Sequence, residues 1–477
     1  MSGTIGKIGD PGARPPYPAP LTILADARDE LLAAVRSSVP PGAVWPDPRK
    51  TWSFRRDPLT PLLELYERFG PVFSVRVMFG TNVFMIGPEA NRFMLVTGRE
   101  NFAWRSGRMG DLIPLLGDGL LTTDGEFHDA SRAIIMPAFH RDRVIAATAV
   151  MTEEATAAAD AIDSREPVDL HHWTRELAMR VAMRALFGFD PDSNRAEEMA
   201  ATFESGLSFY GREYPLQLLW GPFTPAAGLH GDRRRLEKVI GEEIARRRKR
   251  DETDGADILS SLLGATDEGG VRLAEGQVLD HVLTLLFAGH DTSTSTLSFL
   301  AYELARNPDW AERLRAERDA VCGDREPAAE ELLGGLPLLS RAVDETLRLY
   351  PPAWIGARRS VSCYEFAGVK VGAGLPVAYS SYVSHRLPGV FEDPHRFNPD
   401  RFEPEARAKW PPGAYVPFGM GPRVCIGKRF GYAEVHAIAA ALLRRYRLEL
   451  DDDFELTIQQ APTLSPRGGM PIRLTPN

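Results

Sequence analysis

The chain has 477 residues, of which 44% are hydrophobic and 25% are charged, as in an ordinary globular protein. Lys and Arg number 56 against 65 Asp and Glu, and the resulting net charge of −9 argues against a nucleic-acid partner. Three cysteines cannot form the disulfide framework of a secreted protein, so a reducing cytoplasm is the expected compartment.

Residues 1–39 are rich in Pro and Gly and predict an irregular, flexible N-terminal segment with one short helix near residues 25–36. Its most apolar stretch, residues 20–39, is interrupted by five charged side chains, so no membrane anchor or signal peptide is expected. Residues 40–477 show no linker-like change in composition and predict one folded domain. We therefore expect a soluble, cytoplasmic, bacterial protein.

Two short strands are predicted at Val72–Val77 and Val83–Ile86, with Gly80 and Thr81 between them. After Asn91 the pattern becomes mostly helical. The predicted fold class is therefore mainly α with small β-sheets (α+β).

A long helix is predicted over residues 276–306, because Asn307-Pro308 disfavours its continuation. Its first half is apolar on nearly all sides, which is typical of a core helix. A polar run follows in Ala288-Gly-His-Asp-Thr-Ser293, where Thr292 can donate to a backbone carbonyl one turn back. Two interpretations remain: a groove that holds water and passes protons through Asp291 and Thr292, or a kinked core helix whose hydroxyls bond its own backbone.

Glu345 and Arg348 lie three residues apart on a predicted helix that Pro351-Pro352 closes, so they share one face. Taken alone, they predict an exposed ion pair worth well under ~1 kcal/mol. His128 and Arg132 share a helix face in the same way at a spacing of four, and taken alone they predict surface cations.

Cys425 lies in a stretch from Phe418 to Gly427 that combines two further glycines and Arg423 with one thiol. A soft thiolate suits a haem iron, and the glycines would let backbone amides approach a flat macrocycle. Arg423 would meet an anionic group at the edge of that macrocycle. The alternative is a buried free cysteine in a glycine-rich turn.

This stretch resembles the haem-binding loop of the cytochrome P-450 family, Phe-x-x-Gly-x-Arg-x-Cys-x-Gly, and all five fixed positions match. The run Ala288–Ser293 is similar to the oxygen-binding helix motif of the family. Glu345-x-x-Arg348, followed by Leu-Tyr-Pro-Pro, resembles its Glu-x-x-Arg motif, and Pro399-Asp-Arg401-Phe402 resembles its Pro-x-Arg-Phe loop. These motifs occur in family order from about Pro40 to the C-terminus.

The resemblance implies a single-domain cytochrome P-450 fold over residues 40–477, with haem b between the long helix and the cysteine loop. Cys425 would be the axial thiolate ligand, and Asp291 and Thr292 would deliver protons. Glu345, Arg348 and Arg401 would form a structural triad. The implied cofactor contacts are His128, Arg132, Ala288, Arg358, Phe418, Gly421, Arg423, Cys425 and Gly427. Arg359 remains an alternative to Arg358, because neighbouring strand residues point to opposite faces.

The resemblance also implies a monooxygenase that inserts one oxygen atom from O2 into an apolar substrate, such as a lipid, a terpenoid or a macrocycle. Electrons would come from a separate ferredoxin or flavodoxin with its NAD(P)H-dependent reductase, because 477 residues leave no room for a fused flavin domain. A monomer is expected. The residues predicted to line the substrate pocket are Trp104, Met109, Leu112, Phe209, Leu285, Phe287, Ala288, Trp354, Ile355 and Leu464.

Two other functions remain open at this point. One is a haem-thiolate isomerase or dehydratase that does not hydroxylate, against which the Asp291-Thr292 pair argues. The other is a non-catalytic haem-binding or gas-binding protein, which would need neither proton delivery nor a large apolar pocket.

Overall fold

The computed structural model describes residues 28, 32, 38–45, 54, 56–77, 80–212, 214–217, 219, 221–250, 257–266 and 272–477. Apart from residues 28 and 32, the helix predicted near residues 25–36 lies outside the described residues, as does most of the predicted segment 1–39.

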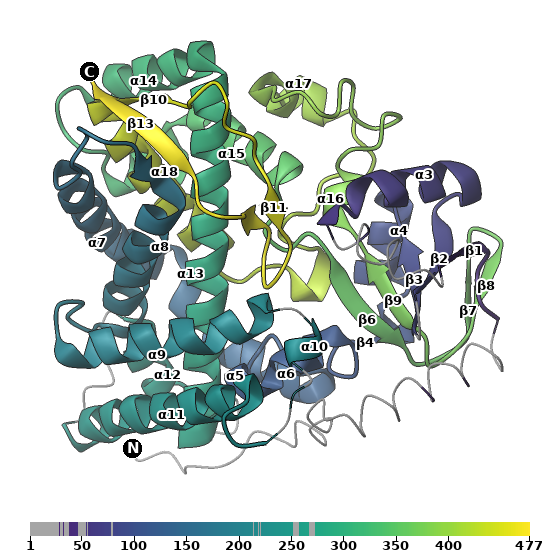
Figure 1. Ribbon diagram of the computed structural model, residues 1–477. Coiled ribbons are helices and arrows are strands. Elements are labelled where there is room, and N and C mark those ends of the chain that lie inside the picture. Colours follow the sequence, from purple (N-terminus) through teal and green to yellow (C-terminus); the bar gives the residue numbers. More distant parts are fainter. Residues whose placement is uncertain are drawn as a thin grey trace.

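The described chain divides into a large helical part and a smaller part built on a sheet (Figure 1). The helical part consists of α5 (Ile113–Leu116), α6 (Gly125–Ile135), α7 (Arg141–Asp160), α8 (Leu170–Val181), α9 (Asn194–Gly211), α10 (Tyr214–Gln217), α11 (Pro225–Lys249), α12 (Ile258–Gly264), α13 (Glu275–Arg306), α14 (Pro308–Cys322), α15 (Pro337–Leu349) and α18 (Lys428–Arg445). Short helices α3 (Leu59–Phe69), α4 (Pro88–Arg92), α16 (Ser381–Ser384) and α17 (Pro404–Arg407) complete the set. The prediction of a mainly α fold with small sheets is confirmed.

The largest sheet has six strands in the order β1-β2-β3-β9-β6-β4. Its strands are β1 (Gly42–Trp45), β2 (Val72–Val77), β3 (Gly80–Met85), β4 (Phe102–Ala103), β6 (Gly356–Ser360) and β9 (Pro376–Tyr379). Alternate side chains enter two separate cores, so that Val83 and Met85 pack on one face while Phe84 packs on the other. This sheet carries β6, which holds Arg358.

The described residues form three smaller sheets as well. They are β10 (Tyr446–Glu449) with β13 (Pro471–Pro476) and β5 (Val168–Asp169), β11 (Ile458–Gln459) with β12 (Ser465–Pro466), and β7 (Tyr364–Phe366) with β8 (Val369–Val371). The β11–β12 turn lies against α13 and brings the chain near its C-terminus to the middle of the molecule.

One predicted strand boundary is wrong. The strand predicted at Val83–Ile86 begins at Gly80, and Thr81 pairs with Arg76 of the antiparallel neighbour. Gly80 and Thr81 therefore belong to the strand rather than to the turn. Glycine has a low β propensity, and here the pairing of β2 overrides it.

Helix α13 forms the axis of the helical part, and it packs against α5, α8, α11, α15 and α18. It ends at Asn307-Pro308, as predicted. Its apolar first half belongs to the main hydrophobic core, and most of its polar second half is buried as well. A buried polar helix needs internal hydrogen-bond partners, which the next subsection identifies.

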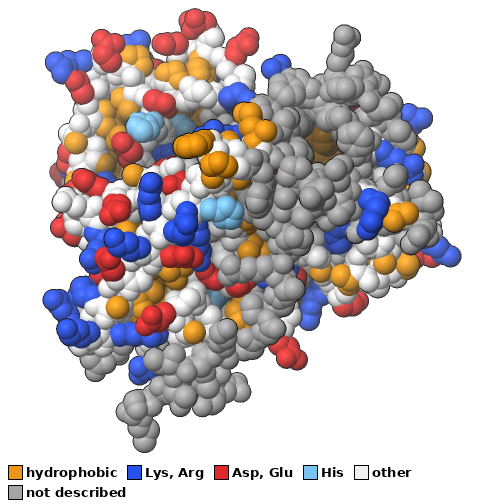
Figure 2. Space-filling view, turned by 60° about the horizontal axis from the view of Figure 1, so that its bottom comes forward, with side chains coloured by type: hydrophobic (Ala, Val, Ile, Leu, Met, Phe, Trp, Pro, Cys, Tyr) orange, Lys and Arg blue, Asp and Glu red, His pale blue; other side chains and the backbone are white. Residues whose placement is uncertain are grey.

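The outer surface carries mixed charge. In Figure 2, Lys and Arg side chains alternate with Asp and Glu side chains over the described helices. Among the described residues, no helix has the length and apolar character that crossing a bilayer requires.

Three buried histidines predict a pH dependence of stability. Burial lowers the pKa of His281 and His436 to about 4 and that of His385 to about 3. In the unfolded chain they titrate near 6.5, so each contributes stability that is fully present above pH 6.5 and is lost as the pH falls toward the folded pKa. Burial raises the pKa of Glu434 to about 8. Its contribution to the free energy of unfolding therefore decreases as the pH rises from 4.5 to 8.

Burial lowers the pKa of further histidines and raises that of further acids, and the histidines are the more numerous group. We therefore expect the free energy of unfolding to rise with pH between pH 5 and pH 6.5. Guanidinium unfolding at constant ionic strength measures this slope. In the variant His436→Gln, which can still donate to the carbonyl of Leu332, the slope should fall by up to about 1.4 kcal/mol per pH unit. An equal slope in both proteins would contradict the assignment.

Candidate functional site

The loop before α18 presents a single thiol. Gly419 and Gly421 both adopt a φ of +69°, and a Cβ at Gly421 would lie 2.8 Å from the carbonyl oxygen of Leu95. Both positions therefore favour glycine. The backbone N–H of Cys425 donates to the carbonyl of Phe418 at 2.9 Å, which closes the loop.

Cys425 touches solvent, yet protein surrounds it closely. Burial raises the pKa of its thiol, while a hydrogen bond from the Gly427 backbone, Arg132 and Lys428 act in the opposite direction. A thiol that is both accessible and surrounded lies in a recess rather than on an outer surface. The Gly427 hydrogen bond and the two positive charges that lower its pKa also stabilise a thiolate.

The predicted cations converge beside this loop. Arg132 of α6 donates to the carbonyl of Val424 at 2.8 Å, and Arg423 donates to Asp124 Oδ1 at 2.9 Å. His128 is close enough to Arg423 for its pKa to be lowered by that charge, after the larger effect of burial. Helix α6 and the cysteine loop therefore present these cations together.

Arg358 joins the same cluster through the indole of Trp104. The guanidinium carbon of Arg358 lies 3.3 Å from the centre of the Trp104 ring, and that of Arg423 lies 4.7 Å from it. Arg358 is only 5% exposed, and burial lowers its pKa to about 10. Within the described part of the chain no carboxylate forms an ion pair with Arg358, so this buried cation lacks a direct counter-charge.

Arg359 points away from this cluster. Its side chain donates to the carbonyls of Ser106 and Gly374, at 2.9 and 3.0 Å. Strand alternation separates the two arginines, and only Arg358 shares the cluster with Arg423.

The middle of α13 has one accessible face. Ala288 is exposed and Gly289 and Thr292 are partly exposed, although the other residues around them are buried. Ala288 and Thr292 lie one turn apart, and the hydroxyl of Thr292 donates to the carbonyl of Ala288 at 2.6 Å. Thr294, Thr296 and Ser298 also donate to carbonyls four residues back. The predicted back-bonding is thus present, together with an accessible strip.

The carboxylate of Asp291 is held from two other segments. Arg175 of α8 donates to Oδ1 at 3.0 Å, and Thr463 of the β11–β12 turn donates to Oδ2 at 2.5 Å. Arg175 also forms an ion pair with Glu204 of α9 at 2.6 Å. Asp291 is therefore a buried junction of α8, α13 and the β11–β12 turn.

Sequence reasoning missed Arg175, Glu204 and Thr463 as partners of this site. The partners Arg175 and Thr463 lie 116 and 172 residues from Asp291 in the chain. No local pattern marks either of them.

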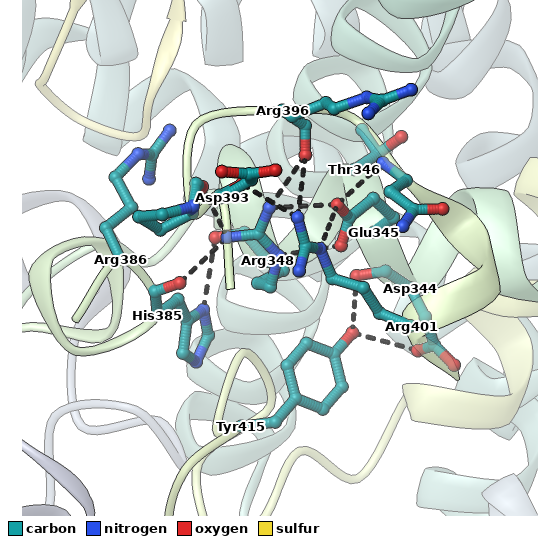
Figure 3. A network of polar contacts seen from close by, with 12 residues as sticks. Asp344, Glu345, Thr346, Arg348, His385, Arg386, Asp393, Arg396, Arg401 and Tyr415 are labelled. Atoms are coloured by element: carbon teal, nitrogen blue, oxygen red, sulfur yellow. Dashed lines mark hydrogen bonds and ion pairs between the residues drawn. The ribbon is translucent and has the colours of Figure 1, made fainter. Parts of the chain in front are cut away.

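The predicted triad is buried and in contact (Figure 3). Arg348 Nε donates to Glu345 Oε2 at 2.7 Å, and both side chains have no exposed surface. Arg401 Nε donates to Glu345 Oε1 at 3.2 Å. The remaining donors of Arg348 reach the carbonyls of His385 and Pro394, both at 2.8 Å. The local alternative, an exposed ion pair, is wrong because the surrounding loops enclose the pair.

His385 links this network to the cysteine loop. Its Nε2 accepts from the backbone N–H of Val416 at 2.9 Å, two residues before Phe418. Its Nδ1 lies 3.3 Å from the carbonyl of Arg348, so the tautomer protonated on Nδ1 satisfies both contacts.

The ten predicted pocket residues fall into distinct environments. Phe209, Leu285, Phe287 and Leu464 are buried in the main core, and Leu112 and Trp354 pack against it. Ile355 packs against the core on one face of the largest sheet, and Met109 is partly exposed. Ala288 lies on the accessible strip of α13, and the ring of Trp104 contacts Arg358 and Arg423. Trp354 and Leu464 come together, because Trp354 donates to the carbonyl of Gln460 and the Leu464 N–H to that of Pro352.

These observations fit a flat cofactor with an anionic edge and a soft metal. The cysteine loop offers an accessible thiol with nearby donors, and α13 offers a strip that carries only small side chains. At one edge, Arg358 is a buried cation in need of an anion. The indole N–H of Trp104 is buried there, without a hydrogen-bond partner among the described residues.

Comparison with known proteins agrees with this geometry. The Cytochrome P450 family profile matches residues 52–470. Cyclooctatin synthase of Streptomyces melanosporofaciens is 34% identical over 76% of this chain and 79% of its own length. Cyclooctat-9-en-7-ol 5-monooxygenase of the same organism is 33% identical over 87% of this chain and 92% of its own. Pentalenene oxygenase of Streptomyces avermitilis is 28% identical over 91% of this chain and 96% of its own.

A solved structure extends the agreement to the fold. Retinoic acid bound cyanobacterial CYP120A1 superposes with a TM-score of 0.82 at 27% identity, covering 92% of this chain and all of that one. The chain therefore belongs to the cytochrome P450 family and is a haem-thiolate monooxygenase, in which a cysteine is the axial ligand of the haem iron.

Proposed function

We propose that this monooxygenase inserts one oxygen atom from O2 into an apolar, terpenoid-type substrate. The observation that carries the proposal is the accessible strip of α13 at Ala288 and Thr292, in an otherwise buried helix. The substrate class is supported by cyclooctatin synthase and pentalenene oxygenase, whose names refer to terpenoids. The proposed substrate range also includes lipids and macrocycles of similar size and polarity.

Cys425 is the proposed iron ligand, and the loop around it positions the sulfur. The bound haem supplies the activation of dioxygen. Gly421 lets the loop pass close to Leu95, and Gly427 directs an amide N–H at the sulfur. Phe418 packs against Tyr432 with ring centres 5.5 Å apart, which fixes the start of the loop. Hydrogen bonds to the sulfur tune the electron density that the thiolate donates to iron.

His128, Arg132, Arg358 and Arg423 are the proposed partners of the haem propionates. Their convergence from α6, β6 and the cysteine loop supports this role. Arg358 is preferred to Arg359, whose side chain is engaged on the other side of β6. Pairing with a carboxylate would offset the cost of burying the Arg358 charge.

Asp291 and Thr292 are the proposed proton-delivery pair. They do not contact one another through their side chains, since Thr292 donates to Ala288 and Asp291 accepts from Arg175 and Thr463. Thr292 would release the Ala288 carbonyl in order to donate its hydroxyl proton on the accessible side of α13. Asp291 would take up a proton from solvent when its hydrogen bond with Arg175 or Thr463 breaks. Glu204, which is partly exposed, supports a route to solvent on this side.

The proposed pocket lies between the accessible strip of α13, the 351–355 loop and the β11–β12 turn. Trp354, which is partly exposed, is proposed to border it, and the other pocket residues predicted from sequence, including the fully buried Leu464, stay predictions. Electrons are proposed to come from a separate ferredoxin or flavodoxin and its NAD(P)H-dependent reductase. We also propose that the protein is a cytoplasmic monomer.

Two measurements test the function. The reduced protein with carbon monoxide should show the red-shifted Soret band of a thiolate-ligated haem. Terpenoid alcohols and hydrocarbons should then shift the ferric spin state, and turnover under ¹⁸O₂ should place one labelled atom in the product. Reduction and binding without any labelled product would support the isomerase or dehydratase alternative instead.

Thr292→Ala should separate oxygen consumption from product formation. Without the hydroxyl, we expect product formation to fall roughly tenfold or more, while electrons continue to reach O2 and leave as hydrogen peroxide. Thr294→Ala is the matched control, because its hydroxyl donates to the His290 carbonyl in the same way but is fully buried. Normal coupling in Thr292→Ala would remove Thr292 from the proton path.

A further inference from the structure

The Trp104 indole combines three features that its apolar character alone does not explain. Two arginines face its ring, at 3.3 and 4.7 Å from the ring centre. Its Nε1 is buried and has no acceptor among the described residues. Its backbone N–H is fixed by Asp124 Oδ2 at 2.8 Å, and the other oxygen of the same carboxylate accepts from Arg423.

The surrounding backbone fixes the position of the ring. Strand β4 pairs with β6 so that Ala103, the residue before Trp104, lies opposite Arg359, the residue after Arg358. A turn follows, closed by the Gly107 N–H donating to the Trp104 carbonyl at 3.0 Å. A Cβ at Gly107 would lie 2.9 Å from the Arg358 backbone, so the turn is packed directly on the strand.

The charge balance at this edge favours an anion. Arg358 and Arg423 share the indole, and Arg423 is the only one of the two that contacts Asp124 in the described structure. A buried N–H without an acceptor costs free energy, and so does a buried guanidinium without a counter-charge. One carboxylate placed here would accept from both, and a haem propionate has this chemistry.

We propose that Trp104 is a haem-binding residue whose indole N–H donates to a propionate, rather than a residue of the substrate pocket. Its ring also holds Arg358 and Arg423 in place, through cation–π contacts. The inference rests on the proposed propionate role of these arginines. It adds a neutral donor to a set that otherwise consists of cations and a histidine.

Trp104→Phe removes the N–H and keeps an aromatic ring for the arginines. We expect haem transfer from the substrate-free ferric protein to excess apomyoglobin to become roughly tenfold faster, the effect of losing one hydrogen bond to a charged acceptor. The reduction potential should become more negative, because the propionate then keeps more of its negative charge. Trp104→His, which restores an N–H donor, should recover part of both effects.

Trp310→Phe is the matched control. Trp310 also carries an arginine, with Arg313 at 3.7 Å from its ring centre, but it lies on α14, away from the site. Equal haem transfer rates and potentials in Trp104→Phe and Trp310→Phe would overturn the proposal. A change in haem transfer or potential that appears only when substrate is present would also overturn the proposal, because it would indicate that Trp104 lines the substrate pocket. If wild-type protein lacks the thiolate–carbonyl band, the proposed iron ligand fails, independently of Trp104.

Discussion

Replacing Cys425 by alanine is expected to abolish the red-shifted Soret band of the reduced carbon monoxide complex and to reduce turnover to background. The band requires a thiolate on the iron, and Cys425 is the accessible thiol of the loop, with the Gly427 N–H, Arg132 and Lys428 lowering its pKa against the effect of burial. Cys425→Ser sharpens the test, because it keeps the size and polarity of the side chain while replacing the soft sulfur with a hard oxygen.

The two other cysteines provide matched controls. Cys322 is buried on α14, and Cys363 is exposed between β6 and β7. Cys322→Ala and Cys363→Ala should keep the band and the turnover of the wild type. A Cys425→Ala protein that retains the band would show that another residue is the ligand.

The conformation of the cysteine loop could be predicted from sequence because it depends on near neighbours. Phe418, Gly421, Arg423 and Gly427 all lie within seven residues of Cys425. The same holds for Glu345 and Arg348, which one helix turn brings together. What sequence could not decide was burial, since an exposed ion pair and a buried one have the same spacing.

Contacts between distant segments account for what was missed. The choice between Arg358 and Arg359 depends on which face of β6 meets the cysteine loop, and only the assembled sheet decides that. Trp104 is predicted from sequence to line the pocket, because an apolar residue in a loop fits that description. Its contact with Arg358 depends on the pairing of β4 with β6, which no local pattern shows.

The substrate pocket is the least predictable part for a physical reason. Residues that fill a core and residues that line an apolar pocket have the same composition and periodicity. Leu285 and Phe287 lie in the main core, whereas Ala288 beside them is exposed. That difference comes from the helices packed around α13 and leaves no mark in the sequence of α13.

The buried triad of Glu345, Arg348 and Arg401 is linked to the cysteine loop through His385. Loss of the triad should therefore affect both stability and cofactor content. In Glu345→Gln, Arg348 keeps its charge and its buried position but loses its only described counter-charge. Removing one partner of a buried ion pair typically costs about 3–5 kcal/mol. We expect the free energy of unfolding to fall by that amount and haem content to fall with it, since His385 joins Arg348 to the backbone of Val416 before the loop.

Glu403→Gln is the matched control, because it makes the same chemical change in the surface pair of Arg341 and Glu403, whose atoms are 3.0 Å apart. Solvent screens that pair, so its loss should cost less than ~1 kcal/mol. Guanidinium unfolding gives both free energies, and the haem absorbance per protein gives the cofactor content. If Glu345→Gln costs no more than Glu403→Gln, the triad does not hold the fold. If it is destabilised but binds haem normally, the link through His385 to the cysteine loop is not needed for haem binding, because the loop then keeps its shape without it.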